Sequence, residues 1–133
     1  KCLVMITPDA ERTMNSYLGI TTDFSKNELS EEAIKNASYL FMEGFLVSSP
    51  TGLEAMKEAK RIAQENNVKV SLTFSDPSMV KYFGDQMKEI VGDGVDLLFC
   101  NIHEAELFAG VEGMEAAIQS RGQESRRSSY GRW

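Results

Sequence analysis

An asparagine and a glutamate three residues apart are the side chains of this sequence best suited to chemistry. Asn101 and Glu104 follow directly after the apolar run 97–100. Such a change is typical of a strand that ends in a turn before a helix. Residues three apart share one face of the first helical turn, so both side chains would point the same way. An amide and a carboxylate beside a helix N-terminus suit an anionic ligand that carries Mg²⁺. The pair predicts a phosphate-handling site.

Two more carboxylates follow apolar runs in the same manner. Glu43 comes after the run 39–42, and Asp76 comes shortly after the run 68–74. If these runs are parallel strands, their carboxyl ends meet at one edge of the sheet, where ligands bind in α/β folds. Carboxylates gathered at one edge repel each other unless a cation or hydrogen-bond donors lie among them. We therefore expect an acidic crevice that holds a cation.

Each of these residues also has a purely structural interpretation. Asp76 would cap a helix that begins at Pro77, and Glu43 would be an ordinary loop carboxylate. Asn101 and Glu104 would form the cap of the helix that follows them. It is the coincidence of all these groups at three strand ends that favours a functional site.

Other chemistries find less support in the residues. His103 is the only histidine, and its place between Asn101 and Glu104 would turn it toward solvent. One histidine and two distant cysteines, Cys2 and Cys100, give no zinc-ligand spacing. Neither G-x-G-x-x-G nor G-x-x-x-x-G-K-[ST] occurs, which argues against dinucleotide-binding and P-loop schemes. Both cysteines lie in apolar runs, which predicts buried, reduced thiols and a cytoplasmic protein.

The composition is that of a globular domain. The chain has 133 residues, of which 42% are hydrophobic and 26% charged, enough for one domain with a core. Its net charge of −6 opposes binding to nucleic acid polymers, which requires cations. No apolar stretch approaches the length of a membrane span and no signal peptide is visible, so we expect no membrane partner.

The chain alternates between strand and helix patterns. Short apolar runs predict strands, and the first of them, 39–42, is unbroken, as in a strand covered on both faces. Amphipathic stretches with capping residues predict the helices between them. This alternation indicates βαβ units with right-handed crossovers, an α/β fold with a mostly parallel sheet. The predicted strands are 39–42, 68–74 and 95–100, and the helices begin at Ser30, Pro50, Pro77 and Asn101 and end near 37, 67, 92 and 110.

The two ends differ from this α/β core, which spans 23–110. Residues 1–22 predict a β-hairpin, with strands at 2–7 and 12–20 around the turn 8–11. Residues 111–133 predict a short helix and then a tail that is disordered or frame-shifted, since four of the six arginines fall among Ser, Gly and Gln there. Because the chain also begins inside an apolar run, we expect an internal fragment of a longer protein.

Taken together, these features resemble the ribokinase-like (PfkB) family of sugar and nucleoside kinases, most closely its bacterial adenosine kinase-like members. N-x-x-E is weak as a motif alone, but its strand context and the other matching segments make the combination specific. The resemblance implies a three-layer α/β/α fold with a mostly parallel sheet and part of a small β lid. The segments that carry it are 7–15, 39–46, 72–77 and 96–105.

The resemblance also implies a reaction and a role for several residues. Asn101 and Glu104 match the N-x-x-E motif, which helps to organise Mg²⁺ and the ATP phosphates. Glu43 matches an acidic strand-end position of the same region. The hairpin resembles the lid that covers the acceptor, with Arg12 as its substrate residue, and it could also join two copies in a homodimer. ATP would phosphorylate a primary hydroxyl of a nucleoside or sugar.

Two family features are absent from the sequence. These are the glycine-rich acceptor segment and the G-x-G-D motif, which supplies the anion hole and the catalytic base. We therefore assign no catalytic residue and expect the isolated chain to be inactive. Two alternatives stay open. One is a non-catalytic α/β interaction module with the hairpin as its contact edge. The other is an unrelated flavodoxin-like domain, which would have no antiparallel hairpin over 2–20.

Overall fold

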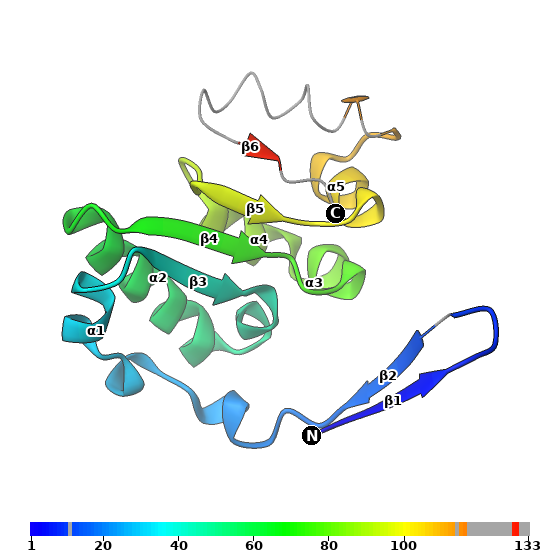
Figure 1. Ribbon diagram of the computed structural model, residues 1–133, viewed down its shortest axis with the longest axis horizontal. Helices are drawn as coiled ribbons and strands as arrows, with labels where there is room; N and C mark the ends of the chain where they lie inside the picture. Colours follow the sequence, from blue (N-terminus) through cyan, green and yellow to red (C-terminus); the bar gives the residue numbers. More distant parts are fainter. Residues whose placement is uncertain (11, 114, 117–128, 131–133) are drawn as a thin grey trace.

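The computed structural model describes residues 1–10, 12–113, 115–116 and 129–130 (Figure 1). Its main sheet has four parallel strands in the order β3-β4-β5-β6. This confirms the predicted α/β fold and places consecutive strands side by side. The strands are β3 (Tyr39–Glu43), β4 (Lys69–Thr73), β5 (Leu97–Phe99) and β6 (Ser129–Tyr130).

The last strand lies in the segment for which the sequence predicts only a short helix and a tail. Backbone pairing places Ser129 beside Leu97 and Tyr130 beside Leu98. Residues 117–128, and most of the helix expected near 114–118, lie outside the described part of the chain. The prediction of a disordered or frame-shifted tail therefore stays a prediction.

Helices begin where the sequence provides caps. Ser30, Ser49 and Asp76 each accept a hydrogen bond from a backbone N–H of the first turn that follows. None of the helices in the described ranges is long and apolar enough to cross a membrane. The helices are α1 (Glu31–Lys35), α2 (Pro50–Glu65), α3 (Pro77–Tyr82), α4 (Gly84–Val91) and α5 (Ile102–Ala109), with 3-10 turns η1 (Gly19–Asp23), η2 (Lys26–Glu28) and η3 (Gly44–Ser48).

The single helix predicted from Pro77 to about residue 92 is wrong, because two helices occupy this segment. Phe83, with φ −124° and ψ 32°, leaves the helical region between α3 and α4. Gly84, a weak helix former, follows it. The break lets α3 contact α5 while α4 contacts α2. The apolar stripe is continuous along the sequence, but its two halves pack against different helices, α5 and α2, and the helix is therefore broken between them.

The core lies between the sheet and the helices on one of its faces. In Figure 1, α2 and α4 lie behind the strands, and α2 contacts both β3 and β4. Met42 of β3 belongs to this core, whereas Tyr39 and Phe41, on the opposite face of the strand, are 48% and 55% exposed. The prediction that β3 is covered on both faces is therefore wrong for the described residues. The most deeply buried large side chains are Met56, Val70, Leu72, Phe74, Met87 and Ile90.

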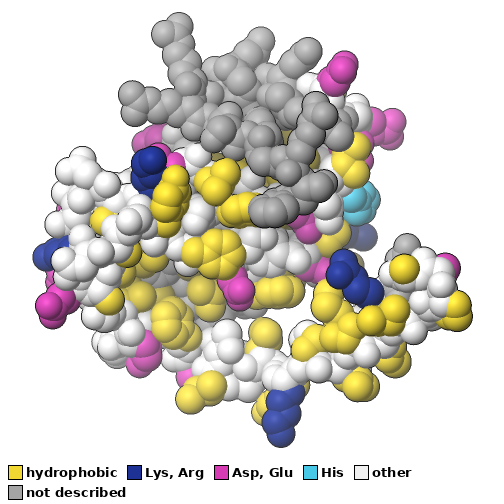
Figure 2. All heavy atoms as spheres, viewed as in Figure 1, with side chains coloured by type: hydrophobic (Ala, Val, Ile, Leu, Met, Phe, Trp, Pro, Cys, Tyr) yellow, Lys and Arg dark blue, Asp and Glu magenta, His cyan; other side chains and the backbone are white. Residues whose placement is uncertain are grey.

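The predicted hairpin is present and extends away from the sheet (Figure 1). Strands β1 (Cys2–Ile6) and β2 (Arg12–Ser16) pair antiparallel, and every residue of both is exposed. Figure 2 shows apolar side chains along it. The prediction that the second strand continues to residue 20 is wrong, because Gly19 has φ +58° and begins η1.

The two cysteines are less buried than predicted. Cys2 is exposed in β1, because no helix covers the hairpin, and Cys100 is half-buried after β5. The Ser16 hydroxyl lies 3.3 Å from Cys2 Sγ on the paired strand. Neither cysteine forms a disulfide within the described ranges. The expectation of two buried thiols is therefore wrong.

Candidate functional site

Parallel pairing brings the predicted residues to one edge of the sheet. Glu43 pairs with Thr73, and Thr73 pairs with Phe99, so β3, β4 and β5 end at the same level. Asp76 and Asn101 follow two of these ends after short turns. The expected convergence of three strand ends is confirmed, and the crevice outside such ends is where α/β folds bind ligands.

Asn101 and Glu104 hold each other in a reciprocal cap of α5. Asn101 Oδ1 accepts a hydrogen bond from the Glu104 backbone N–H at 2.8 Å. Glu104 Oε2 accepts from the Asn101 backbone N–H at 3.0 Å, and Oε1 accepts from Asn101 Nδ2 at 3.1 Å. The structural interpretation is thus realised, but each carboxylate oxygen has a second lone pair. The cap fixes the pair and leaves acceptors for a cation.

The Glu104 carboxylate is held in an environment that disfavours its charge. The residue is only 5% exposed. Burial raises the pKa of Glu104 above its usual value, the Asn101 backbone N–H lowers it, and the negative charge of Asp76 raises it again, with a smaller lowering effect from His103. No lysine or arginine of the described part pairs with it within 4.0 Å. A bound cation would relieve this cost.

Asp76 caps α3, as the structural interpretation of this residue predicts. Its Oδ1 accepts hydrogen bonds from the backbone N–H of Ser78 at 2.8 Å and from the Ser78 hydroxyl. The same carboxylate acts electrostatically on Glu104. Asp76 therefore belongs to the acidic edge although its hydrogen bonds are those of a helix cap.

Glu43 is exposed at the end of β3 and makes no side-chain cap with η3. The residue after it explains its position. A Cβ atom on Gly44 would lie 2.6 Å from the Phe74 carbonyl oxygen and 2.8 Å from that of Thr73. Only glycine permits this approach of β3 to the end of β4. Sequence reasoning missed this role of Gly44, for which a Glu-Gly pair after an apolar run was the sole signal.

Ser75 is a second residue that the sequence did not single out. It has φ +69°, and the Asp76 backbone N–H donates to the Phe74 carbonyl at 2.8 Å across it. A hydrogen bond spanning three residues with a positive central φ defines a rare, strained γ-turn. The Ser-Asp-Pro sequence predicts a cap, and nothing in it reveals the strain.

Arg12 and His103 lie apart from the paired groups. Arg12 is exposed at the start of β2, in the hairpin that Figure 1 shows separate from the sheet, on the side to which the parallel strands point. The structure therefore does not bring Arg12 to Asn101 and Glu104. His103 is exposed on α5, as the sequence predicts.

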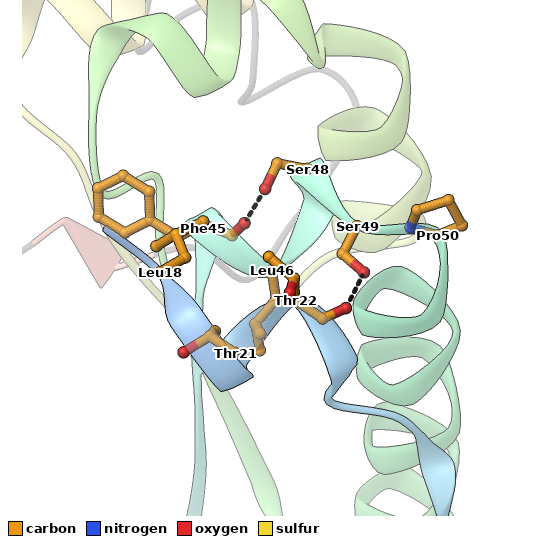
Figure 3. A pocket seen from close by; sticks show the side chains of 8 residues that line it. All are labelled: Leu18, Thr21, Thr22, Phe45, Leu46, Ser48, Ser49 and Pro50. Atoms are coloured by element: carbon orange, nitrogen blue, oxygen red, sulfur yellow. Dashed lines mark hydrogen bonds between the residues drawn. The ribbon is translucent and has the colours of Figure 1, made fainter. Parts of the chain in front are cut away.

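A pocket of about 250 Å³ lies between the hairpin connector and the start of α2 (Figure 3). The Ser49 hydroxyl donates to the Thr22 carbonyl at 3.2 Å and ties the connector to α2. No titratable side chain lines the pocket, so it offers no acid–base chemistry. Its lining residues are Leu18, Thr21, Thr22, Phe45, Leu46, Ser48, Ser49 and Pro50.

The donor set at the strand edge fits a hard cation. Within the described ranges, no group of three or more His, Cys, Asp or Glu side chains could hold a metal by itself. Mg²⁺ needs no such cage, because it keeps several waters and binds through one or two carboxylates and substrate phosphates. Asn101 and Glu104 offer oxygen atoms only, and the buried carboxylate gains from a positive charge. The residues thus fit Mg²⁺.

Comparison with solved structures reveals the same fold in larger proteins. An adenosine kinase from Sinorhizobium meliloti superposes with a TM-score of 0.88 at 25% identity, over 97% of this chain and 40% of that one. A probable sugar kinase from Rhizobium etli CFN 42 also superposes with a TM-score of 0.88 at 25% identity, over 97% of this chain and 39% of that one. The ribokinase-like fold is thereby confirmed. This chain spans about 40% of the length of these structures.

Sequence comparison identifies the family. An uncharacterized sugar kinase of Escherichia coli K12, YegV, is 31% identical over 51 residues, which are 38% of this chain and 16% of that protein. The profile of the pfkB family carbohydrate kinases matches residues 1–127. Together with the hairpin, this excludes the flavodoxin-like alternative. The chain belongs to the PfkB family of carbohydrate kinases.

Proposed function

We propose that this chain is the part of an ATP-dependent kinase that organises Mg²⁺ and the ATP phosphates. The observation that carries the proposal is the buried Glu104 carboxylate, fixed by Asn101 at the edge of a parallel sheet and facing the charge of Asp76. In phosphoryl transfer the protein mainly positions the groups and stabilises charge. A carboxylate that needs a cation is suited to that task.

Each strand end has a role in this proposal. Asn101 and Glu104 hold Mg²⁺ through their oxygen atoms or through its water ligands, and Glu43 approaches the same ion from the end of β3. When bound, Mg²⁺ neutralises the charge that develops on the phosphates. The fixed geometry of the Asn101–Glu104 cap supports this assignment, because ligands on a rigid element are oriented before the ion arrives.

The acceptor in this proposal is the primary hydroxyl of a nucleoside or sugar, with an adenosine-like nucleoside favoured by the likeness to an adenosine kinase. The hairpin covers the acceptor and Arg12 contacts it. In Figure 1 the hairpin lies on the side of the sheet to which the parallel strands point, which supports this role.

The proton-transfer half of the reaction is assigned to no residue of this chain. The sequence contains no G-x-G-D motif, so no residue here is proposed as the catalytic base. We therefore expect the purified 133-residue chain to bind Mg·ATP weakly and to phosphorylate nothing. Phosphorylation of adenosine by this chain alone would contradict that expectation.

Titration calorimetry with Mg·ATP tests the metal and phosphate role. Glu104→Gln can still accept from the Asn101 backbone N–H, since glutamine also serves at this position, but it removes the charge and one of the two acceptor oxygens. We expect it to abolish the heat of binding, and Asn101→Ala to weaken it. Glu112→Gln removes an exposed charge beyond α5 and is the matched control. Equal affinity in all four chains would contradict the proposal.

A non-catalytic interaction module is the second candidate, and the exposed hairpin favours it. Val4 and Ile6, which share one face of β1, are 46% and 68% exposed, and a two-stranded hairpin with no covering layer is only marginally stable. Pairing of two hairpins would cover these side chains in a homodimer. Sedimentation of the wild type against Val4→Lys/Ile6→Lys tests this. A monomeric wild type would contradict it.

A further inference from the structure

Ser75 combines two unfavourable features at one residue. Its backbone forms the strained γ-turn between Phe74 and Asp76, with φ +69°. Within the described ranges, its hydroxyl is also the buried side-chain polar atom that has no hydrogen-bond partner. Both features raise the free energy of the folded state, since a buried polar group without a partner loses its bonds to water. Strain of this kind concentrates at functional sites.

The polar groups around Ser75 are already engaged. The Thr73 hydroxyl oxygen accepts from the Ser75 backbone N–H at 3.1 Å, and the Asp76 carboxylate accepts from Ser78. On the β3 side, Gly44 packs against the carbonyl of Phe74. The turn is therefore held between two strand ends that carry the proposed site.

The charged side chains of this edge offer no hydrogen-bond donor. An ionised carboxylate can accept hydrogen bonds but cannot donate them, and this holds for Glu43, Asp76 and Glu104. Phosphoryl oxygens, in contrast, require donors. Ser75 as a residue is partly exposed, although its hydroxyl oxygen is turned inward. A rotation about its Cα–Cβ bond is thus a short path by which the hydroxyl can reach a ligand.

We infer that Ser75 is a further phosphate-binding residue of this site, whose hydroxyl turns outward and donates a hydrogen bond to a phosphoryl oxygen of the Mg²⁺-bound nucleotide. The inference rests on the proposed function, because it assumes that Mg·ATP binds beside Glu104. It accounts for both unfavourable features: the turn positions the serine at the edge, and the ligand supplies the missing partner.

Calorimetry and thermal unfolding of the 133-residue chain, with Mg·ATP as the probe, test the inference. We expect Ser75→Ala to weaken binding about tenfold, the value of one hydrogen bond to a charged group. Without ligand, its Tm should equal or exceed that of the wild type. Ser75→Gly should be more stable still, because glycine tolerates positive φ, and should bind as weakly as Ser75→Ala. A purely structural serine would instead lower Tm and leave the affinity unchanged.

Two controls separate this inference from the proposed function. Ser48→Ala removes a hydroxyl that donates to the Phe45 carbonyl away from the site, and it should bind Mg·ATP as the wild type does. If Ser75→Ala binds within twofold of the wild type while Glu104→Gln does not bind, the inference is wrong and the proposed function stands. If the wild type and Glu104→Gln bind equally, or neither binds, both are wrong.

Discussion

Burial raises the pKa of Glu104, and the Asp76 carboxylate raises it further across the contact between α3 and α5. These two residues cap different helices, and each satisfies its own backbone hydrogen bonds. Their charges nevertheless oppose each other at the edge of the sheet. The protein therefore carries an electrostatic cost in its ligand-free state that a cation at this edge would convert into binding free energy.

This cost predicts a particular pH dependence of stability. Because burial raises the pKa of Glu104 in the folded state, the folded chain binds more protons than the unfolded chain between the usual value of 4.5 and the raised value. The favourable contribution of Glu104 to the free energy of unfolding is therefore fully present below pH 4.5. It is lost as the pH rises through the folded-state pKa. Glu104→Gln should thus be more stable than the wild type at pH 7 and show no advantage near pH 4.

Urea unfolding of both chains between pH 4 and pH 8 measures this difference. Glu112→Gln, which removes an exposed carboxylate, should follow the wild type at every pH. A Glu104→Gln chain that is less stable than the wild type at pH 7 would show that the ionised carboxylate is needed for the cap, contrary to the argument.

The cap itself predicts a contrast between two substitutions of Asn101. Asn101→Ala removes the acceptor for the Glu104 backbone N–H and should cost about 1 kcal/mol of unfolding free energy. Asn101→Ser keeps an uncharged hydroxyl acceptor at the cap position and should retain most of that stability. Urea unfolding at pH 7 distinguishes the two. Equal losses would indicate that the hydrogen bond at 2.8 Å contributes nothing.

The fold was predictable where local patterns and tertiary packing agree. The strand before Glu43 and the helix that begins at Pro50 were recognised because apolar runs, capping residues and proline placement act within a few residues of each other. The break at Phe83 and the exposure of Phe41 were not, because they depend on which distant elements pack there. Periodicity reports an apolar stripe but not its partners.

The candidate site likewise has features that follow from local sequence spacing and features that depend on tertiary packing. The spacing of Asn101 and Glu104 places both in one helical turn, so the sequence suffices to pair them. The approach of Gly44 to β4 and the positive φ of Ser75 are set by the distance between strand ends. The coupling of Asp76 to Glu104 depends on how α3 meets α5. No local sequence pattern encodes these relationships.

The close approach at the end of β3 predicts that Gly44→Ala is strongly destabilising. The added methyl group would lie 2.6 Å from a backbone oxygen that cannot move without disturbing β4, so we expect a loss of about 2–4 kcal/mol. Gly84→Ala is the matched control, because nothing lies within 4 Å of its Cβ position. It should stabilise the chain by up to about 1 kcal/mol. Similar changes in both variants would contradict the argument.

Lys60 joins α2 to the end of α4. Its Nζ donates to the carbonyls of Ile90 and Val91 at 2.9 Å each, and the residue is 9% exposed. Lys60→Met keeps most of the side-chain volume but leaves both carbonyls without this donor, so we expect urea unfolding to show a loss of about 2–3 kcal/mol. Lys57→Met removes a lysine one turn away whose ion pairs are exposed, and it should cost less than about 1 kcal/mol. If Lys60→Met cost no more than Lys57→Met, the buried lysine would not be the link between the two helices.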